Sequence, residues 1–175
     1  STTTLEVTVA AKTAAHRYNG DGSGSGYVID GVQAPILTLT PGRTYRFDTS
    51  DSSNNGHPLR FYLDVDKTYA YTSGVTVAGT AGNSGSYTEI TISDTTPAVL
   101  HYQCTAHGKM GNSVITQSNV VNTPHDATFE GVLNAKGNVD LGNATSDTIT
   151  ATGRFDSDLL PSTDGARDLG SSDNE

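Results

Sequence analysis

The stretch Leu100-His-Tyr-Gln-Cys-Thr-Ala-His-Gly-Lys-Met-Gly111 decides the fold of this chain of 175 residues. It contains the only cysteine and the only methionine, Cys104 and Met110, with His107 between them. One thiolate, two histidines and a weak axial methionine form a blue-copper site. A second histidine must therefore come from elsewhere, and His57, in the segment Asn-Asn-Gly-His-Pro-Leu, is well placed to supply it.

The spacing of these residues has a geometric reason. Residues 99–104 have the pattern of a strand, which places Leu100, Tyr102 and Cys104 on its inner face and His101 and Gln103 on the other. Cys104 is then the last inward residue before the chain turns back over the strand end, where glycines permit a tight backbone. We expect this loop to bring His107 and Met110 close to the sulfur of Cys104.

The loop Cys104-Thr-Ala-His-Gly-Lys-Met110 resembles the copper loop of cupredoxins, and its Cys-x2-His-x2-Met spacing is similar to that of the amicyanin branch. The order of a strand, a Pro-Gly turn, a strand, an Asn-rich loop and His57 is also similar to the cupredoxin segment that carries the upstream copper histidine. The resemblance covers roughly residues 4–118. It implies a Greek-key β-sandwich and a type 1 copper site made of His57, Cys104, His107 and Met110.

Short alternating segments along residues 1–118 predict the same class of fold. The expected strands number about seven or eight, as in a two-sheet Greek-key sandwich. They fall at residues 5–9, 36–40, 44–48, 59–63, 87–92, 99–104 and 113–116.

Each proposed ligand has an ordinary alternative role. A lone cysteine is usually a small core residue and a lone methionine a gap filler. A cupredoxin-shaped sandwich with no metal in use therefore stays open, as does zinc, although methionine is a poor zinc ligand. His16, His101 and His125 are not expected to be ligands, because His101 lies on the opposite strand face and His125 lies in a linker. No general base, nucleophile or substrate pocket is evident, so we do not expect an enzyme.

Charge and aromatic content change sharply along the chain. Residues 1–119 contain 9 acidic and 7 basic side chains, whereas residues 120–175 contain 10 and 3, and only two of the 12 Phe and Tyr residues lie beyond position 119. Such a shift marks a domain boundary. We predict a sandwich over residues 1–118, a linker over 119–127 and a distinct segment over 128–175. The net charge of −9 argues against nucleic acid as a partner, and no apolar run is long enough for a membrane span.

The C-terminal segment contains a short repeat. The pattern Leu133-x-Ala-x-Gly-x-Val-Asp140 recurs as Ile149-x-Ala-x-Gly-x-Phe-Asp156. Alternating apolar residues with small spacers favour a β-structured repeat that is too short and too polar to build its own core. Winding three identical chains together would bury its apolar face and pair its strand edges. The alternative is a disordered acidic tail.

This segment also resembles tailed-phage fibre proteins. The run Leu159-Leu-Pro-Ser-Thr-Asp-Gly-Ala-Arg-Asp-Leu-Gly-Ser-Ser-Asp-Asn174 is similar to a segment that follows repetitive fibre shafts. The stretch that begins at Tyr27, with His57-Pro-Leu-Arg-Phe61, looks like domains of marine phage structural proteins. The resemblance implies a homotrimeric virion protein (a tail fibre, whisker or decoration) that contacts other virion proteins and a host-surface receptor. Loops 19–26 and 74–86 are the expected contact loops. The alternative is a secreted or periplasmic type 1 copper electron-transfer protein.

Overall fold

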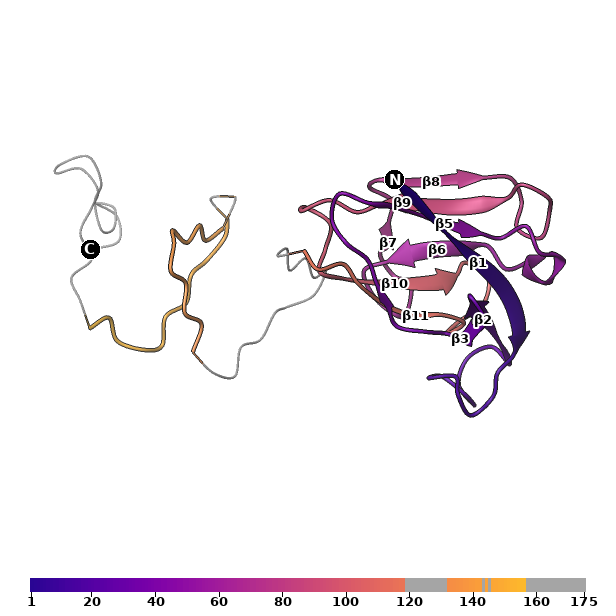
Figure 1. Cartoon of the computed structure of the whole chain (residues 1–175). Coiled ribbons are helices and arrows are strands. Elements are labelled where there is room, and N and C mark those ends of the chain that lie inside the picture. Colours follow the sequence, from indigo (N-terminus) through magenta and orange to yellow (C-terminus); the bar gives the residue numbers. More distant parts are fainter. Residues whose placement is uncertain (119–131, 143, 145, 157–175) are drawn as a thin grey trace. The chain divides into compact units, whose positions relative to one another are not determined.

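The computed structural model describes residues 1–118, 132–142, 144 and 146–156. In this part of the chain the regular structure is eleven β-strands and one short 3-10 helix, so the prediction of an all-β fold is confirmed (Figure 1). The chain divides into two units, Ser1–Thr128 and Phe129–Glu175. The predicted linker, residues 119–127, lies outside the described residues.

The elements are β1 Thr2–Ala11, β2 Ser25–Ile29, β3 Val32–Gln33, β4 Leu37–Thr38, β5 Thr44–Asp48, η1 Ser52–Asn54, β6 Leu59–Tyr62, β7 Ala70–Tyr71, β8 Val75–Ala78, β9 Tyr87–Thr91, β10 Val99–Cys104 and β11 Asn112–Ile115.

The strands form two mixed sheets in a β-sandwich-like arrangement. The first sheet has the order β3-β2-β1-β5-β9-β8 and the second has the order β4-β11-β10-β6-β7. Strand β1 pairs with two neighbours: its first half runs parallel to β5 and its second half runs antiparallel to β2. In the second sheet β10 lies between β6 and β11, antiparallel to both. The strand that carries Cys104 is therefore a central strand.

The core lies between these sheets, and strands β5, β9 and β11 alternate between buried and more exposed residues. In β5, Tyr45 and Phe47 are buried while the intervening Arg46 is partly exposed. Phe47 of the first sheet meets Phe61 of the second edge to face, with 5.4 Å between ring centroids. Contacts of this kind across two inner faces fix the packing of a sandwich.

The predicted strands are mostly present, with different bounds at several ends. Residues 44–48 and 99–104 form β5 and β10 with the expected bounds, whereas β1 is longer than predicted and β4 is shorter. Four strands were not predicted: β2, β3, β7 and β8. Three of them are edge strands or short partners whose sequences alternate over too few residues to be recognised.

The second unit looks different within residues 132–142, 144 and 146–156. These residues form no strand in the single chain. Their large apolar side chains are all exposed: Val132, Leu133, Val139, Leu141, Ile149 and Phe155. The predicted trimeric β-structure needs partner chains and stays a prediction. The fibre-like run 159–174 lies outside the described residues.

Within the described residues, no helix has the length and apolar character needed to cross a bilayer.

Candidate metal centre

Strand pairing brings His57 to the end of the strand that carries Cys104. Cys104 is the last residue of β10 and pairs with Leu59, the first residue of β6. The Thr105 N–H then donates to the Pro58 carbonyl at 3.1 Å. Because His57 precedes Pro58, its side chain emerges at the same sheet end as the Cys104 thiol.

The loop after β10 brings His107 back to this point. Lys109 adopts a left-handed conformation with φ of 59°, which helps the chain reverse. At Gly111 a Cβ would overlap the Tyr102 carbonyl, so only glycine lets the returning chain pass so close to β10. The Gly111 N–H donates to the Gln103 side chain at 3.0 Å. The loop thus buries Gln103, which sequence alternation placed on the outer face of the strand.

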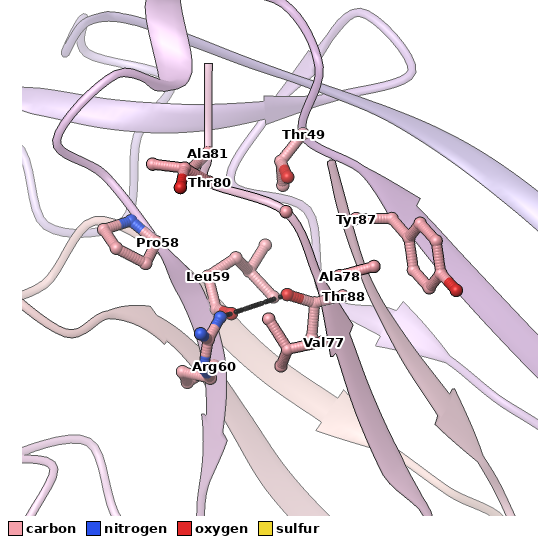
Figure 2. Close-up of a pocket in the computed structure, with 11 residues that line it drawn as sticks. Thr49, Pro58, Leu59, Arg60, Val77, Ala78, Thr80, Ala81, Tyr87 and Thr88 are labelled. Carbon is pink, nitrogen blue, oxygen red and sulfur yellow. Dashed lines mark hydrogen bonds between the residues drawn. The ribbon is translucent and has the colours of Figure 1, made fainter. Parts of the chain in front are cut away.

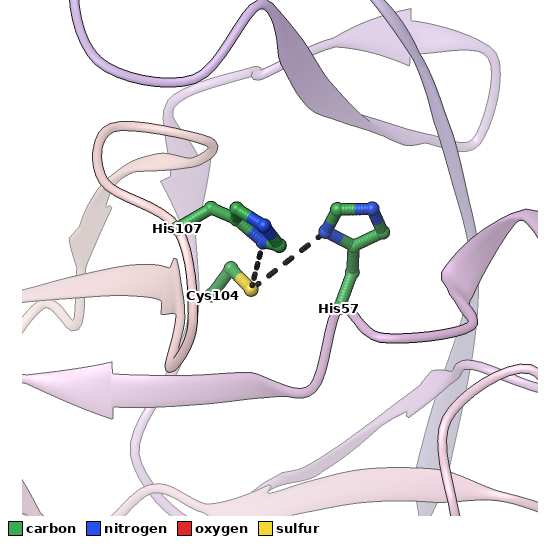
Figure 3. Close-up of side chains that lie close together, drawn as sticks. All are labelled: His57, Cys104 and His107. Atoms are coloured by element: carbon green, nitrogen blue, oxygen red, sulfur yellow. Dashed lines mark hydrogen bonds between the residues drawn. The ribbon is translucent and has the colours of Figure 1, made fainter.

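Three side chains converge at the sheet end (Figure 3). The Cys104 Sγ lies 3.6 Å from His107 Nδ1 and 3.9 Å from His57 Nδ1. The two imidazole rings are tilted by 45° to each other, with 4.6 Å between centroids. One ligand atom from each residue lies within 4.8 Å of the others. Of the four predicted ligands, His57, Cys104 and His107 lie close together as a cluster that could hold a metal ion.

The distances fit a shared metal ion. A first-row ion about 2.0–2.1 Å from nitrogen and about 2.3 Å from sulfur holds the two ligand atoms roughly 3.5–3.8 Å apart at angles between tetrahedral and trigonal. The distance of 3.6 Å from Cys104 to His107 falls in this interval, and the distance of 3.9 Å from Cys104 to His57 lies just above it. Without an ion the same contacts are weak hydrogen bonds between thiol and imidazole.

Burial and charge favour neutral imidazole at the site. Burial lowers the pKa of His57 below its ordinary value of 6.5, and repulsion from His107 lowers it further. A neutral imidazole is the form that coordinates metal. Cys104 is fully buried, His57 is half-buried and His107 is exposed. The cluster therefore opens to solvent on the side of His107.

Met110, the predicted axial ligand, is fully buried in the core cluster that also contains Cys104. Its carbonyl accepts the Tyr27 N–H at 2.8 Å and lies 3.1 Å from His16 Nε2. Coordination by its thioether remains a prediction.

The other histidines take different places. His16 is buried and bonded to the backbone of the loop, and burial lowers its pKa. His101 lies outside the three-residue cluster, and burial lowers its pKa too. His125 lies outside the described residues.

Sequence reasoning missed two residues at the site, Lys67 and Tyr27. The Lys67 ammonium donates to three carbonyls of the ligand loop, and the Tyr27 hydroxyl donates to the His57 carbonyl. Burial raises the pKa of Tyr27 well above its ordinary value, and the nearby Cys104 raises it further. Neither residue belongs to a ligand motif, so only the fold could reveal them.

A separate hollow of about 230 Å³ lies between β6, β8 and β9 (Figure 2). Its polar groups satisfy one another, since the Thr88 hydroxyl donates to the Leu59 carbonyl and Arg60 donates to both. Its lining residues include no Asp, Glu, His or Cys. This hollow therefore offers no acid–base pair and no metal ligand set of its own.

No family model, no curated protein and no solved structure matches the chain in sequence or in fold. The chemistry of the metal cluster must therefore be argued from its own residues.

Proposed function

We propose that residues 1–118 form a cupredoxin-like Greek-key domain that binds one copper ion of the type 1 kind through His57, Cys104, His107 and Met110. The observation that carries the proposal is the convergence of one thiol and two imidazole Nδ1 atoms from two separate segments. The sandwich-like pair of mixed sheets, with Cys104 ending a central strand, supports the cupredoxin likeness.

The donor set favours copper over zinc. Soft thiolate with imidazole and a thioether suits copper, whereas the described cluster offers three strong ligands and a structural zinc site commonly has four. A bound copper ion supplies one-electron chemistry between Cu(I) and Cu(II). In the protein, the buried Cys104 keeps the sulfur from solvent and the half-buried His57 keeps its imidazole neutral.

The test is an absorption titration of the purified full chain with Cu(II). An intense charge-transfer band near roughly 600 nm is the expectation for a copper–thiolate bond of this family. Cys104→Ser should abolish the band, and His101→Ala, a histidine outside the cluster, should leave it unchanged. A wild-type chain that gives no band, or a Cys104→Ser chain that keeps it, would refute the copper site.

For the whole chain we propose a virion structural protein, a tail fibre, whisker or decoration. The cupredoxin-like domain would be displayed on a homotrimeric shaft, attached to other virion proteins and in contact with a host surface. Support comes from the exposed apolar side chains of the repeat, Leu133, Val139, Ile149 and Phe155. A single chain leaves them in water, and a bundle of three would cover them.

Light scattering on the full chain tests the fibre proposal. A stable trimer is expected, and Phe155→Asp should weaken it because a charge would enter the covered face. A monodisperse monomer at all protein concentrations would contradict the proposal.

The second candidate function is electron transfer by a secreted or periplasmic carrier. The exposed ring of His107 favours it, because an imidazole at the surface brings a bound ion close to a redox partner. Rapid electron self-exchange of the copper-loaded protein would favour this candidate, whereas a trimer with slow exchange would favour the virion role.

A further inference from the structure

The main chain at the metal centre is held in an unusual way. Each of the four predicted ligands has its own carbonyl oxygen bonded to Lys67 or Tyr27, and the Met110 carbonyl also lies 3.1 Å from His16 Nε2. Lys67 lies in the turn between β6 and β7, and Tyr27 lies in β2 of the other sheet. The two residues therefore reach the site from opposite sheets.

Lys67 holds the loop that carries Cys104 and His107. Its Nζ donates to the carbonyls of Cys104 at 3.0 Å, Thr105 at 3.1 Å and His107 at 3.2 Å. One ammonium group thus uses its three protons on three carbonyls of a single turn. The Lys67 ammonium therefore holds the main chain at both Cys104 and His107, which restricts the distance between the two ligands.

The turn that presents Lys67 is itself ordered. Lys67 has a left-handed backbone with φ of 64°, a conformation that costs energy for a residue with a Cβ. Asp64 closes the turn by accepting the N–H groups of Thr68 at 3.2 Å and Tyr69 at 3.1 Å. The ordered turn therefore fixes the position from which the Lys67 side chain extends to the ligand loop.

Tyr27 holds the remaining two ligands. Its hydroxyl donates to the His57 carbonyl at 2.9 Å, and its backbone N–H donates to the Met110 carbonyl at 2.8 Å. The whole side chain is buried, and its ring lies 6.4 Å from the ring of Tyr102. A buried tyrosine has few rotamers, so its hydroxyl fixes the His57 backbone firmly.

We infer that Lys67 and Tyr27 are positioning residues of the metal centre, which hold the main chain of all four ligands in binding geometry before an ion arrives. The inference rests on the proposed function for its copper readout, but the preformed loop is a property of the metal-free chain. Outer partners of this kind commonly affect metal affinity by about 10–100-fold when removed.

The charge of Lys67 adds a second effect. A cation bonded to the main chain of the ligands Cys104 and His107 disfavours Cu(II) relative to Cu(I), because the oxidised ion carries one more positive charge. Loss of Lys67 should therefore lower the reduction potential of the bound ion. Loss of the neutral Tyr27 hydroxyl removes no charge, so the reduction potential of the bound ion distinguishes the effects of the two residues.

The experiment compares two variants of the full chain with two matched controls. Lys67→Leu removes the ammonium without adding a metal ligand, and Lys136→Leu is its control, since Lys136 is an exposed lysine that lies outside the strands and outside the ligand loop. Tyr27→Phe removes one hydroxyl, and Tyr102→Phe is its control, because Tyr102 is equally buried and donates to the Pro35 carbonyl.

Three quantities are measured on each protein. Hydrogen exchange of residues 104–111 reports the order of the loop without metal, competition with a coloured chelator gives the Cu(I) affinity, and voltammetry gives the potential. We expect Lys67→Leu and Tyr27→Phe to speed exchange in the loop and to weaken copper binding by about 10–100-fold. The controls should keep wild-type values, and only Lys67→Leu should lower the potential through charge.

Two outcomes would overturn the inference. Wild-type exchange in both test variants would show that neither residue holds the loop, and an equal loss in test and control variants would show a general effect on stability. A wild-type chain that binds no copper would instead refute the proposed function. In that case the exchange rates of the metal-free proteins still decide whether the two residues hold the loop.

Discussion

Two regions of this chain carry alternating apolar residues and reach opposite outcomes. In residues 1–118 the alternation builds two sheets around a core in which Val7, Phe47, Ile90 and others are fully buried. In residues 132–142, 144 and 146–156 a similar alternation forms no strand and leaves Leu133 and Phe155 exposed. An alternating pattern specifies a strand only where a partner strand and an opposing face are present.

The difference lies in where the partners come from. The N-terminal region supplies its own, since β1 pairs with β5 about forty residues further along the chain. The C-terminal repeat has two copies only, and these offer no second sheet to pack against. Among the described residues no strand pairs with that region, and in the proposed trimer the other chains would supply the partners.

The largest expected effect comes from a pair of phenylalanines, one in each region. Phe47→Ala should destabilise the domain by about 3–5 kcal/mol, because it leaves a cavity against Phe61. Phe155→Ala should leave the unfolding of the domain unchanged, since this side chain is exposed. Urea unfolding followed by tyrosine fluorescence measures both, and a lower midpoint for Phe155→Ala would break the contrast between the regions.

A pair of glycines gives a second, smaller contrast. Gly111→Ala should cost about 1–3 kcal/mol or more, because the new methyl group overlaps the Tyr102 carbonyl and forces the loop away from β10. Gly137→Ala should be neutral, since a Cβ there meets nothing within 4 Å. Thermal unfolding of the two variants tests this, and equal melting temperatures would contradict the tight passage at Gly111.

Acid should weaken the N-terminal region through its buried histidines. Burial lowers the pKa of His16 and of His101 below the ordinary value of 6.5. The unfolded chain then binds more protons than the folded chain below this value, so stability is full above about pH 6.5 and declines as the pH falls towards the folded pKa values. Urea midpoints at a series of pH values measure the slope, and His101→Gln should make it shallower. A slope that is unchanged in this variant would exclude His101 as a contributor.

The smallest effect is expected on the outer face of the first sheet. Arg46 and Glu89 are directly opposite residues of β5 and β9, with 2.9 Å between the charged groups. Both side chains are partly exposed, so Glu89→Gln should cost less than about 1 kcal/mol. Raising the salt concentration should remove most of the difference between the two proteins, and a large cost that persists in salt would show that the pair is more than a surface contact.

The sequence was sufficient for the class of fold and for the three-residue cluster. Strand alternation placed Cys104 at the end of a strand, and the spacing to His107 required a loop that turns back, which is what the structure has. The position of His57 after an Asn-rich loop predicted it as the second histidine. The pairing of Leu59 with Cys104 explains why His57 lies at the same sheet end as the thiol.

The rest depends on contacts between residues far apart in sequence. Gln103 is buried because the returning loop places the Gly111 N–H against its side chain. Lys67 makes its three bonds because the β6–β7 turn lies next to the same loop. Loop 19–26, predicted as a contact loop for a host surface, also contacts the ligand loop, since the Ser23 N–H donates to the Gly108 carbonyl. No local sequence pattern predicts such contacts, because they depend on pairing between strands that are far apart in the sequence.

The graded exposure of the cluster has a kinetic consequence. An ion that entered the cluster from water would meet the exposed imidazole of His107 first, then the half-buried His57, and would reach the buried sulfur of Cys104 last. If the proposed copper site holds, loading would be stepwise, and release would run through the same opening in reverse. Oxidants and alkylating reagents face the same opening, so the only thiol of the chain should react slowly when the site is empty and more slowly still when it is filled.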